Sequence, residues 1–422
     1  MVAPARGQLG PDILGGDPRN AQRRRMEELA DKLLGKKSLA HIESQLGVLH
    51  SAYVHPNRTL HYDDLLVCLL LGFYNPTVRS LRTLEGLSQT TYLQEHLSVD
   101  RICRSTTSDA MALFDPGLLE PIIKELHAQV PGIAQADAPF ADIVQKIIAG
   151  DGSYFTIYND VAWALIHTKT DGRKQAQIRL NLQIDALSSE PLRASISGND
   201  GSEPQAVKPD LLADAIYLFD RNFVDFGLMN AIVEVGSEFV IRCKSNAPSF
   251  QVRRERELTG KDREHGVVSD RVGILPGSGG DTPKPPGQEL REVVIDGSDG
   301  KPVRLLTTLL DLPAWMIGLL YRKRWQVELF FRWLKVWANF EHLICHNKNG
   351  LLIQFYVAVI GVLLMYVRLG RRISKYAYSL LTVVAAGGAT LEQILPILER
   401  REHEKELERA RLARKQAAKK QA

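Results

Sequence analysis

The spacing of the apolar residues changes near residue 143, and this change limits the folds open to the chain. From Met26 to Val130 the apolar residues recur at helical spacing. Three successive runs rich in β-branched and aromatic residues then follow: 143–158, 161–169 and 175–187. A buried-type strand ending at Asp220, a helical stretch and the run EFVIRCK come next. Three meandering strands followed by a strand–helix–strand unit predict an α/β fold with a mixed sheet.

Length and composition are those of a soluble globular protein. The chain has 422 residues, 45% of them hydrophobic and 24% charged, which is enough for two or three domains. The formal net charge of +4 is too small to identify a partner. Basic residues gather instead in the N-terminal segment, in the stretch 321–335 and in the C-terminal tail, an arrangement compatible with nucleic acid.

Cysteine usage and hydropathy argue against a zinc or disulfide-bonded protein and against a membrane protein. The four cysteines have no CxxC or Cys/His spacing, so we expect reduced core thiols in a cytosolic protein and no zinc site. The longest apolar run, residues 351–367, is short for a membrane span and contains Gln354. We interpret it as a buried helix, which leaves a membrane or scaffolding protein as the weaker alternative.

The stretch YRKRWQVELFFRWLK, residues 321–335, lacks Gly and Pro and predicts a helix. At about 100° per residue its polar side chains fall on one face: Tyr321, Arg324, Glu328, Arg332 and Lys335. Val327, Phe330, Trp333 and Leu334 form an apolar stripe on the opposite face. A single carboxylate among cations and a phenol suits a metal ion beside a phosphate. The alternative is a solvated face with an ordinary Arg324–Glu328 ion pair.

Two aspartates at predicted strand ends complete a candidate site. Asp151 follows the first strand in the small-residue turn Gly150–Ser153, and Asp220 ends the strand 216–219. If these strands are neighbours, the two carboxylates emerge side by side and Glu328 can join them from a helix packed on the sheet. Three oxygen ligands without His or Cys suit Mg²⁺ or Mn²⁺. Taken singly, each Asp is more typical of a turn or cap residue.

These residues resemble a known family. Tyr321, Arg324, Glu328 and Lys335 match Y-x2-R-x3-E-x6-K, the signature of bacterial insertion-sequence DDE transposases of the IS-four family. The family's first acid lies in a DG[ST] motif and its second in DR-x-[YF], which Asp151 and Asp220 match in sequence order. The segment FVIRCKSNA, which contains Arg242 and Lys244, is similar to the family's next strand. The resemblance covers about residues 140–370.

The resemblance implies a ribonuclease-H-like catalytic core, interrupted by a β-rich insertion. Asp151, Asp220 and Glu328 would bind two Mg²⁺ ions, for which Mn²⁺ would substitute. The family's reaction is hydrolytic nicking at element ends, followed by attack of the freed 3′-hydroxyl on target DNA. DNA phosphates would be bound by six side chains: Tyr321, Arg324, Arg332, Lys335, Arg242 and Lys244.

The implied partners and place in the cell follow the same resemblance. The substrate is double-stranded DNA, both the terminal inverted repeats and the target, and a homodimer would pair two ends. The protein would be cytoplasmic and associated with the bacterial nucleoid, without a membrane. Two alternatives remain: an inactive DNA-binding descendant of a transposase, or another ribonuclease-H-like nuclease.

The domain organisation we expect combines the period changes with the resemblance. The segments are a disordered basic segment (1–24), a helical DNA-binding domain (25–140), the catalytic core (141–244 and 311–345), the β-rich insertion (245–310), C-terminal helices (346–400) and a charged tail (401–422). One departure concerns the DNA hairpin intermediate, to which a Trp of the insertion contributes in related enzymes. Residues 245–312 contain no Trp, and the nearest is Trp315.

Overall fold

The computed structural model describes residues 39–369 apart from short gaps, together with scattered positions between 376 and 411. The gaps are 54, 74–77, 95, 131–137, 158–160, 169–170, 200, 246, 277–283, 298–299 and 338–342. The chain divides into two compact units, Ser44–Arg372 and a second unit formed by Met1–Glu43 with Ile373–Ala422. The expected basic segment 1–24 lies outside the described residues, as does most of the expected tail.

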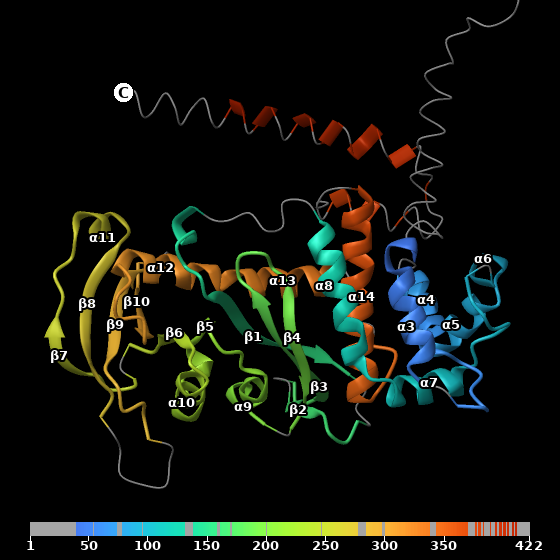
Figure 1. Ribbon diagram of the computed structural model, residues 1–422, viewed down its shortest axis with the longest axis horizontal. Helices are drawn as coiled ribbons and strands as arrows, with labels where there is room; N and C mark the ends of the chain where they lie inside the picture. Colours follow the sequence, from blue (N-terminus) through green and yellow to red (C-terminus); the bar gives the residue numbers. More distant parts are fainter. Residues whose placement is uncertain are drawn as a thin grey trace, which may run out of the picture. The chain divides into compact units, whose positions relative to one another are not determined.

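A mixed sheet organises the larger unit, as the sequence predicts (Figure 1). Its first part has the strand order β2-β3-β1-β5-β6, and β4 also pairs with β3. The strands are β1 (Lys146–Thr156), β2 (Leu165–Thr168), β3 (Lys174–Asp185), β4 (Pro191–Ser197), β5 (Ala215–Phe219) and β6 (Glu238–Cys243). The β1–β3 pair is antiparallel, whereas β1–β5 and β5–β6 are parallel. This is the arrangement of a ribonuclease-H-like core.

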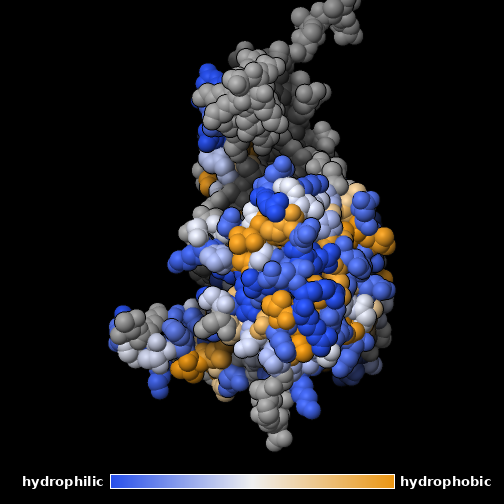
Figure 2. Space-filling view, turned by 90° about the vertical axis from the view of Figure 1, so that its left-hand side faces the viewer, coloured by the Kyte–Doolittle hydropathy of each residue, from blue (hydrophilic) through white to orange (hydrophobic). Residues whose placement is uncertain are grey.

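The segment expected to be an insertion continues the same sheet. The strands β7 (Gln251–Glu255), β8 (Val267–Ile274), β9 (Leu290–Asp296) and β10 (Pro302–Thr307) extend it in the order β6-β10-β9-β8-β7, with α11 (Gly260–Glu264) between β7 and β8. The edge strand β7 is exposed along its whole length and carries Arg253 and Arg254, charges that oppose pairing with another sheet. Figure 2 views this end of the molecule, which is mostly hydrophilic with small hydrophobic patches.

A buried ion pair ties this extension to the chain that leads back into the core. Arg291 on β9 is 1% exposed and forms two parallel 2.7 Å hydrogen bonds with the carboxylate of Asp270 on β8. The same guanidinium donates to the backbone carbonyls of Leu309 and Leu310, 3.2 Å away. Bidentate pairs of this kind are geometrically specific. The extension therefore fixes the loop before α12 (Ala314–Lys323).

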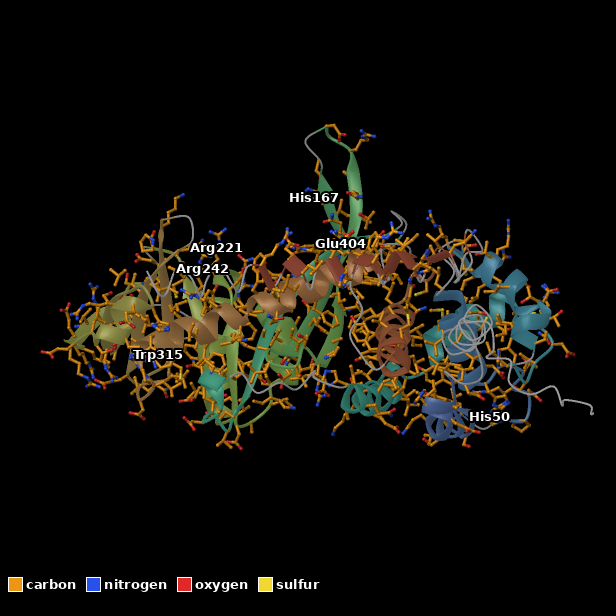
Figure 3. All side chains as sticks on the ribbon, turned by 90° about the horizontal axis from the view of Figure 1, so that it is seen from above. His50, His167, Arg221, Arg242, Trp315 and Glu404 are labelled. Carbon is orange, nitrogen blue, oxygen red and sulfur yellow. The ribbon has the colours of Figure 1, made fainter. Side chains whose placement is uncertain are left out.

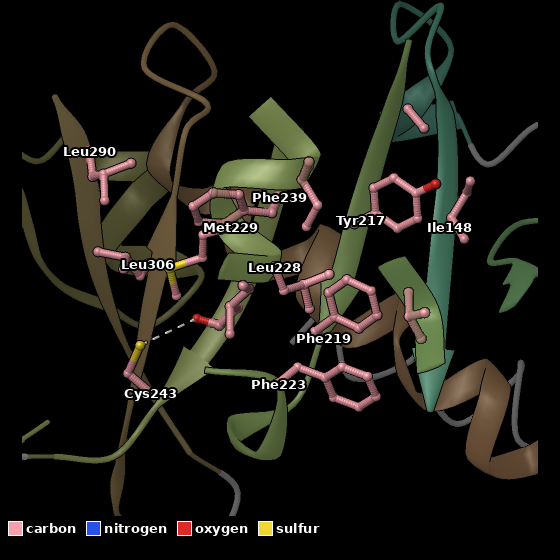
Figure 4. Close-up of a cluster of buried hydrophobic side chains, with 14 of the residues drawn as sticks. Ile148, Tyr217, Phe219, Phe223, Leu228, Met229, Phe239, Cys243, Leu290 and Leu306 are labelled. Atoms are coloured by element: carbon pink, nitrogen blue, oxygen red, sulfur yellow. Dashed lines mark hydrogen bonds between the residues drawn. The ribbon is translucent and has the colours of Figure 1, made fainter. Parts of the chain in front are cut away.

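Large apolar side chains fill the space between β5, β6 and the helix α10 (Phe226–Glu234) (Figure 4). Phe219 stacks on Phe223 with ring centroids 4.5 Å apart, and Tyr217 stacks on Phe219 at 5.7 Å. Every residue of β5 is buried, as expected for a central parallel strand. The short helix α9 (Glu203–Val207) also packs on β1 and β3. In Figure 1, α9 and α10 lie on one side of the sheet, and α12 and α13 (Trp325–Trp337) lie on the other.

Helices form the part of the unit N-terminal to the sheet, as the apolar spacing predicts. They are α3 (Glu43–Ser51), α4 (Tyr62–Phe73), α5 (Leu81–Ser88), α6 (Thr91–Gln94), α7 (Arg104–Leu113) and α8 (Glu120–Gln129), with 3₁₀ turns at Pro116–Leu119 and Ala138–Phe140. Within the sheet region there are 3₁₀ turns at Lys208–Asp210 and Arg221–Phe223, and the second unit has one at Ala40–Ile42. Helix α14 (Lys348–Leu369) packs against α4, α7 and α8. It contains the one described segment long and apolar enough to cross a membrane, but 78% of that window is buried. It is a core helix in this structure.

The sequence reading missed one strand. The sequence predicts a polar loop at 196–204 that leads to a helix at 205–214, yet the strand β4 precedes this loop, runs to Ser197 and pairs with β3. Its residues are mostly half-buried, because it covers only part of β3. The predicted helix at 205–214 is also shorter, since α9 and its 3₁₀ continuation end at Asp210.

Thiol chemistry gives a direct check of this packing. All four cysteines are free, and Cys103 is the only one of them that is not fully buried. Burial raises the pKa of Cys243 to about 11 and the pKa of Cys68 and Cys345 to about 12. At pH 8 we therefore expect a disulfide reagent to modify one thiol in the native protein and four in guanidinium. Rapid native reaction of several thiols, followed by absorbance, would contradict the packing.

Candidate active site

Asp151 and Asp220 lie level with each other on neighbouring parallel strands. The register of β1 and β5 places Ala149 opposite Leu218, and each aspartate lies two residues further along its strand. The prediction that these strands are neighbours is confirmed. Strand β5 ends at Phe219, and Asp220 then caps the following 3₁₀ turn, accepting a 2.8 Å hydrogen bond from the amide of Asn222.

The segment around Asp151 is not the turn that the sequence suggested. Strand β1 continues without interruption to Thr156 and pairs with β3 along this stretch. The small residues have another cause, which is close packing. A Cβ atom on Gly150 would lie 2.3 Å from the Phe219 ring, and one on Gly152 would lie 2.6 Å from Oε1 of Glu203. Glycine is needed at position 150 because the ring of Phe219 occupies the space of a side chain, whereas at position 152 a side chain would displace the flexible side chains of Glu203 and Arg179.

The predicted single helix over 321–335 is divided at Arg324. Helix α12 ends at Lys323 and α13 begins at Trp325, and Arg324 between them has the hydrogen bonding of a 3₁₀ turn. Its amide donates to the carbonyl of Tyr321 at 3.1 Å, and its own carbonyl accepts from the amide of Val327 at 3.2 Å. These are three-residue bonds in place of the four-residue bonds of an α-helix. The backbone at Arg324 stays helical, so the rod in Figure 1 is nearly continuous.

The Arg324 side chain lies between two of the three acids. One of its terminal nitrogens is 3.9 Å from Oδ2 of Asp151, and the other forms a short ion pair with Glu328. The i,i+4 pair expected of a solvated helix face is therefore present, but the Arg324 side chain is only 11% exposed. Its Nε is buried without a hydrogen-bond partner in the described structure.

The sequence predicts that the polar row and the apolar stripe lie on opposite faces of the helix, but in the structure they are adjacent. Tyr321, Val327, Phe331 and Leu334 are buried, whereas Phe330 is half-exposed. Arg324 and Lys335 of the polar row thus border the buried stripe and lie toward β1, on which α13 packs, whereas Arg332 of the same row is exposed. The side chain of Trp333 lies outside the described part of the structure.

Three other predicted phosphate-binding residues, Lys335, Arg332 and Arg242, have separate surroundings. Lys335 lies over the Phe155 ring of β1, with Nζ 4.9 Å from its centroid. Arg332 is exposed and lies over Trp325 at 6.0 Å. Arg242 on β6 is half-buried, and Figure 3 shows it close to Arg221, in agreement with the contact between their elements.

Tyr321 and Lys244 complete the set. Tyr321 is 9% exposed, and its hydroxyl has no hydrogen-bond partner among the described residues. Burial raises the pKa of its phenol, whereas Arg324 and Arg242 lower it; the Arg324 guanidinium is near enough to bond the hydroxyl, although not in good hydrogen-bond geometry. Lys244 is exposed just beyond β6, and its side chain is not among the groups in contact with the acids.

The carboxylates lie close enough to affect one another's ionisation. Burial raises the pKa of Asp151 to about 7, the amide of Gly152 and Arg324 oppose the shift, and the charges of Asp220 and Glu203 add to it. Burial and Asp220 likewise raise the pKa of Glu203, against the effect of Arg179. Glu203 was missed by sequence reasoning, which placed it in a polar loop. The available signal was Ser202-x-x-Gln205, a helix-capping pattern that the structure forms.

The donor set suits a hard divalent cation, since it offers only oxygen ligands around a buried negative centre. In the described residues no three His, Cys, Asp or Glu side chains converge on one point that could hold an ion. Asp151 and Glu328 do not converge on one point because the guanidinium of Arg324 lies between them. The residues therefore fit such an ion chemically, provided that Arg324 moves from Glu328.

Trp315 is engaged elsewhere. It is the second residue of α12, where Nζ of Lys261 lies 3.7 Å from its ring centroid and the His265 ring packs beside it at 5.2 Å. Figure 3 shows it well separated from Arg221 and Arg242. Trp315 therefore holds α11 against α12.

Comparison with known proteins assigns this arrangement to a family. Residues 144–364, just over half of the chain, match the family model described as the transposase DDE domain. The chain belongs to the DDE transposase family. The matched segment contains Asp151, Asp220 and Glu328.

Curated transposases resemble the same part of the chain. A putative transposase of Sinorhizobium fredii is 28% identical over 214 residues, 50% of this chain and 58% of that protein. A probable transposase for an insertion sequence element of Geobacillus stearothermophilus is 26% identical over 210 residues, 49% of this chain and 52% of that protein. The chain thus spans little more than half the length of these relatives.

A solved structure, the piggyBac transposase synaptic complex with hairpin DNA, is a more distant likeness. It shares 11% identity with this chain at a TM-score of 0.37, covering 87% of this chain and 81% of that one.

The shift at Asp151 predicts that the stability of the metal-free protein depends on pH. Between pH 3.8 and about 7 the folded state retains a proton that the unfolded state has released. The free energy of unfolding should therefore fall as pH rises through this window. At about 1.4 kcal/mol per pH unit, Asp151→Asn should stabilise the protein at pH 8 by about 2–4 kcal/mol.

Urea unfolding in EDTA at pH 5 and pH 8 measures this effect. The parent protein should lose stability between the two pH values, and Asp151→Asn should lose less. Equal losses in the two proteins would show that the Asp151 carboxyl titrates normally.

Proposed function

We propose that this chain is a DNA transposase that cleaves insertion-sequence ends and joins the freed 3′-hydroxyl to target DNA. The observation that supports it most is the level placement of Asp151 and Asp220 on parallel strands, with Glu328 reaching toward them from α13 through Arg324. Members of this family generally use divalent metal ions, and this cluster is where the chain could hold them.

Asp151, Asp220 and Glu328 would hold two Mg²⁺ ions, or Mn²⁺ in their place. Bound there, the ions would activate the attacking oxygen and stabilise the leaving oxygen of a phosphodiester. The protein contributes a sheet edge that fixes the two aspartates and a helix that brings Glu328. It also keeps this edge largely out of water, as the raised pKa of Asp151 indicates.

The cations beside the acids would bind the DNA phosphates. Arg324 has a buried Nε without a partner, and Tyr321 has a buried hydroxyl in the same condition within the described structure. A phosphate entering here could accept from both groups. It would also attract Arg324 away from Glu328, which leaves that carboxylate available for an ion. Lys335, Arg332, Arg242 and Lys244 would contact phosphates further from the cleaved bond.

Sequence-specific recognition would fall to the helical region 25–140. A cavity of about 410 Å³ there is lined by residues that include Arg79, Arg82 and Arg104, together with His346. Guanidinium groups around an open cavity are suited to a DNA backbone. We assign the remaining segments as expected from the sequence: the core at 141–244 and 311–345, the insertion at 245–310, C-terminal helices at 346–400, and basic or charged ends at 1–24 and 401–422.

A homodimer would pair the two ends of the element, and the protein would act in the bacterial cytoplasm at the nucleoid. The apolar helix α14 supports this placement because it is occupied by packing against α4, α7 and α8. An inactive DNA-binding descendant is the second candidate, and Arg324 paired with Glu328 is the observation that favours it. Another ribonuclease-H-like nuclease is the third, and strand transfer into a plasmid separates it from a transposase.

Loss of one acid should separate cleavage from binding. Glu328→Ala should abolish Mg²⁺-dependent nicking of a labelled duplex carrying the element end, yet retain binding of that duplex. The reason is that Glu328 would act on the metal and not on DNA recognition. Glu234→Ala, an exposed acid on α10, is the matched control and should nick normally. Metal-dependent nicking at the parental rate by Glu328→Ala would remove Glu328 from the catalytic set.

Loss of the shared guanidinium should act mainly on the later step. Arg324→Ala should weaken strand transfer by about ten- to a hundredfold, because a charge-assisted phosphate contact contributes about 1.5–3 kcal/mol. Joined products in a plasmid target measure this, with Arg263→Ala on α11, an exposed arginine, as control. Strand transfer by Arg324→Ala equal to that of Arg263→Ala would exclude a phosphate-binding role.

A further inference from the structure

A two-stranded ribbon projects from the edge of the sheet at which the candidate acids lie. Strand β3 continues past the end of β1, and β2 pairs with it there in antiparallel register. Figure 3 shows this ribbon, with His167 on it, extending beyond the other strands on the side that carries Arg221 and Arg242. The ribbon belongs to neither the acid cluster nor the helical N-terminal region.

The pairing of β1 with β3 gives the reach of this ribbon. Asp151 is opposite Leu182, and Lys174 lies eight residues further along β3. At about 3.3 Å per residue, the outer end of the ribbon is about 26 Å from the level of Asp151. One turn of B-DNA is about 34 Å long, so a duplex with a phosphate at the acids can meet the ribbon within a single turn.

One face of the ribbon carries a cation in line with those of α13. Successive residues of a strand alternate between faces, so Lys174 lies on the same face as Asp151. Arg324 is beside Asp151 on that face. Four residues further along β1, Nζ of Lys335 lies 4.9 Å from the ring centroid of Phe155. The three cations therefore follow the strands from the acids toward the tip, at intervals of about 13 Å.

The tip of the ribbon is positively charged and exposed. Residues 165–177 contain three cations, Lys169, Arg173 and Lys174, against the one carboxylate of Asp171. The Arg173 side chain is 82% exposed, and its ion pair at 2.7 Å is with Asp171, two residues earlier. Lys174 is exposed as well. Positive charge at the end of a projecting ribbon is complementary to the phosphate backbone of DNA.

The face that carries Lys174 also offers groups suited to base edges. Ile166 pairs with Ala176 and is 56% exposed, and Thr168 pairs with Lys174 and is also exposed. An apolar side chain can contact the methyl group of thymine, and a hydroxyl can bond several base edges. The major groove, about 12 Å wide, admits a two-stranded ribbon. Shape and chemistry together favour duplex DNA over another sheet as the occupant.

We propose that the β2–β3 ribbon lies in the major groove of the bound duplex, within one helical turn of the cleaved bond. The inference rests on the proposed function, which places the cleaved phosphate at the acids. Arg173 and Lys174 bind backbone phosphates, and Ile166 and Thr168 face the bases. Asp171 repels the backbone and holds the Arg173 side chain while no DNA is present.

The salt dependence of binding to the end duplex, measured in EDTA so that the duplex stays intact, counts these contacts. Each phosphate contact contributes about 0.9 to the slope of log K against log salt, or about eightfold in affinity at about 0.1 M salt. Arg173→Gln and Lys174→Gln should each lose about this much. Asp171→Asn should bind more tightly, because a repulsion is removed. Arg263→Gln, at an exposed arginine on α11, is the matched control and should bind as the parent does.

Methylation by dimethyl sulfate locates the ribbon on the duplex, because the reagent attacks N7 of guanine in the major groove. With guanines placed at successive positions, the parent should protect some of them within about ten base pairs of the cleaved bond. The double variant Arg173→Gln/Lys174→Gln should lose this protection. Its thermal unfolding should match that of the parent, since both side chains are exposed, and the single variants decide if the double variant does not fold.

The outcomes distinguish the two proposals. Parental salt slope and parental protection in Arg173→Gln and Lys174→Gln overturn the role of the ribbon and leave the proposed function standing. Unchanged protection with an altered oligomeric state in sedimentation would make the ribbon a contact between copies of the chain, which also overturns it. Ribbon-dependent binding without metal-dependent nicking would support the ribbon and overturn the proposed function. Failure of the parent to bind the end duplex overturns both.

Discussion

Electrostatic repulsion among carboxylates at the ends of β1 and β5 is the constraint on which this structure depends. Parallel pairing of these strands brings Asp151 and Asp220 level, and burial makes their charges expensive to maintain. On the α13 face the positive charge of Arg324 offsets part of this repulsion, because its guanidinium lies between Asp151 and Glu328. The guanidinium of Arg324 therefore occupies a position in which a divalent metal ion could neutralise the same carboxylates.

The rest of the fold holds that arrangement in place. The strands β7 to β10 are not a detached module, because they extend the central sheet through β6 and β10. The buried Arg291–Asp270 pair connects them to the loop that enters α12, and so to the position of Arg324. A change in the extension can therefore reach the site through α12 without touching an acid.

Much of this could be predicted from the sequence, for identifiable reasons. The succession of strands and helices along the chain follows from apolar runs whose spacing is local, and the motifs around Asp151, Asp220 and Glu328 lie on three separate elements in the family's order. Two misreadings have one cause, which is that close packing is not visible in a pattern. The glycines around Asp151 were taken for a turn, although they make room for Phe219 and Glu203. The polar row of the Tyr321 helix was placed opposite the apolar stripe, although its Arg324 and Lys335 border that stripe and lie toward β1. Glu203 itself comes from a polar stretch whose only signal is a cap.

The central claim is that one set of acids on β1, at the end of β5 and on α13 holds the reactive metal. Iron substitution tests it most directly: Fe²⁺ replaces Mg²⁺, peroxide and ascorbate generate hydroxyl radicals at the bound ion, and mass spectrometry locates the backbone cuts. With an end duplex present, the account predicts cuts clustered near Asp151, Asp220 and Glu328, suppressed by excess Mg²⁺. Cuts confined to other segments, or unaffected by Mg²⁺, would contradict it.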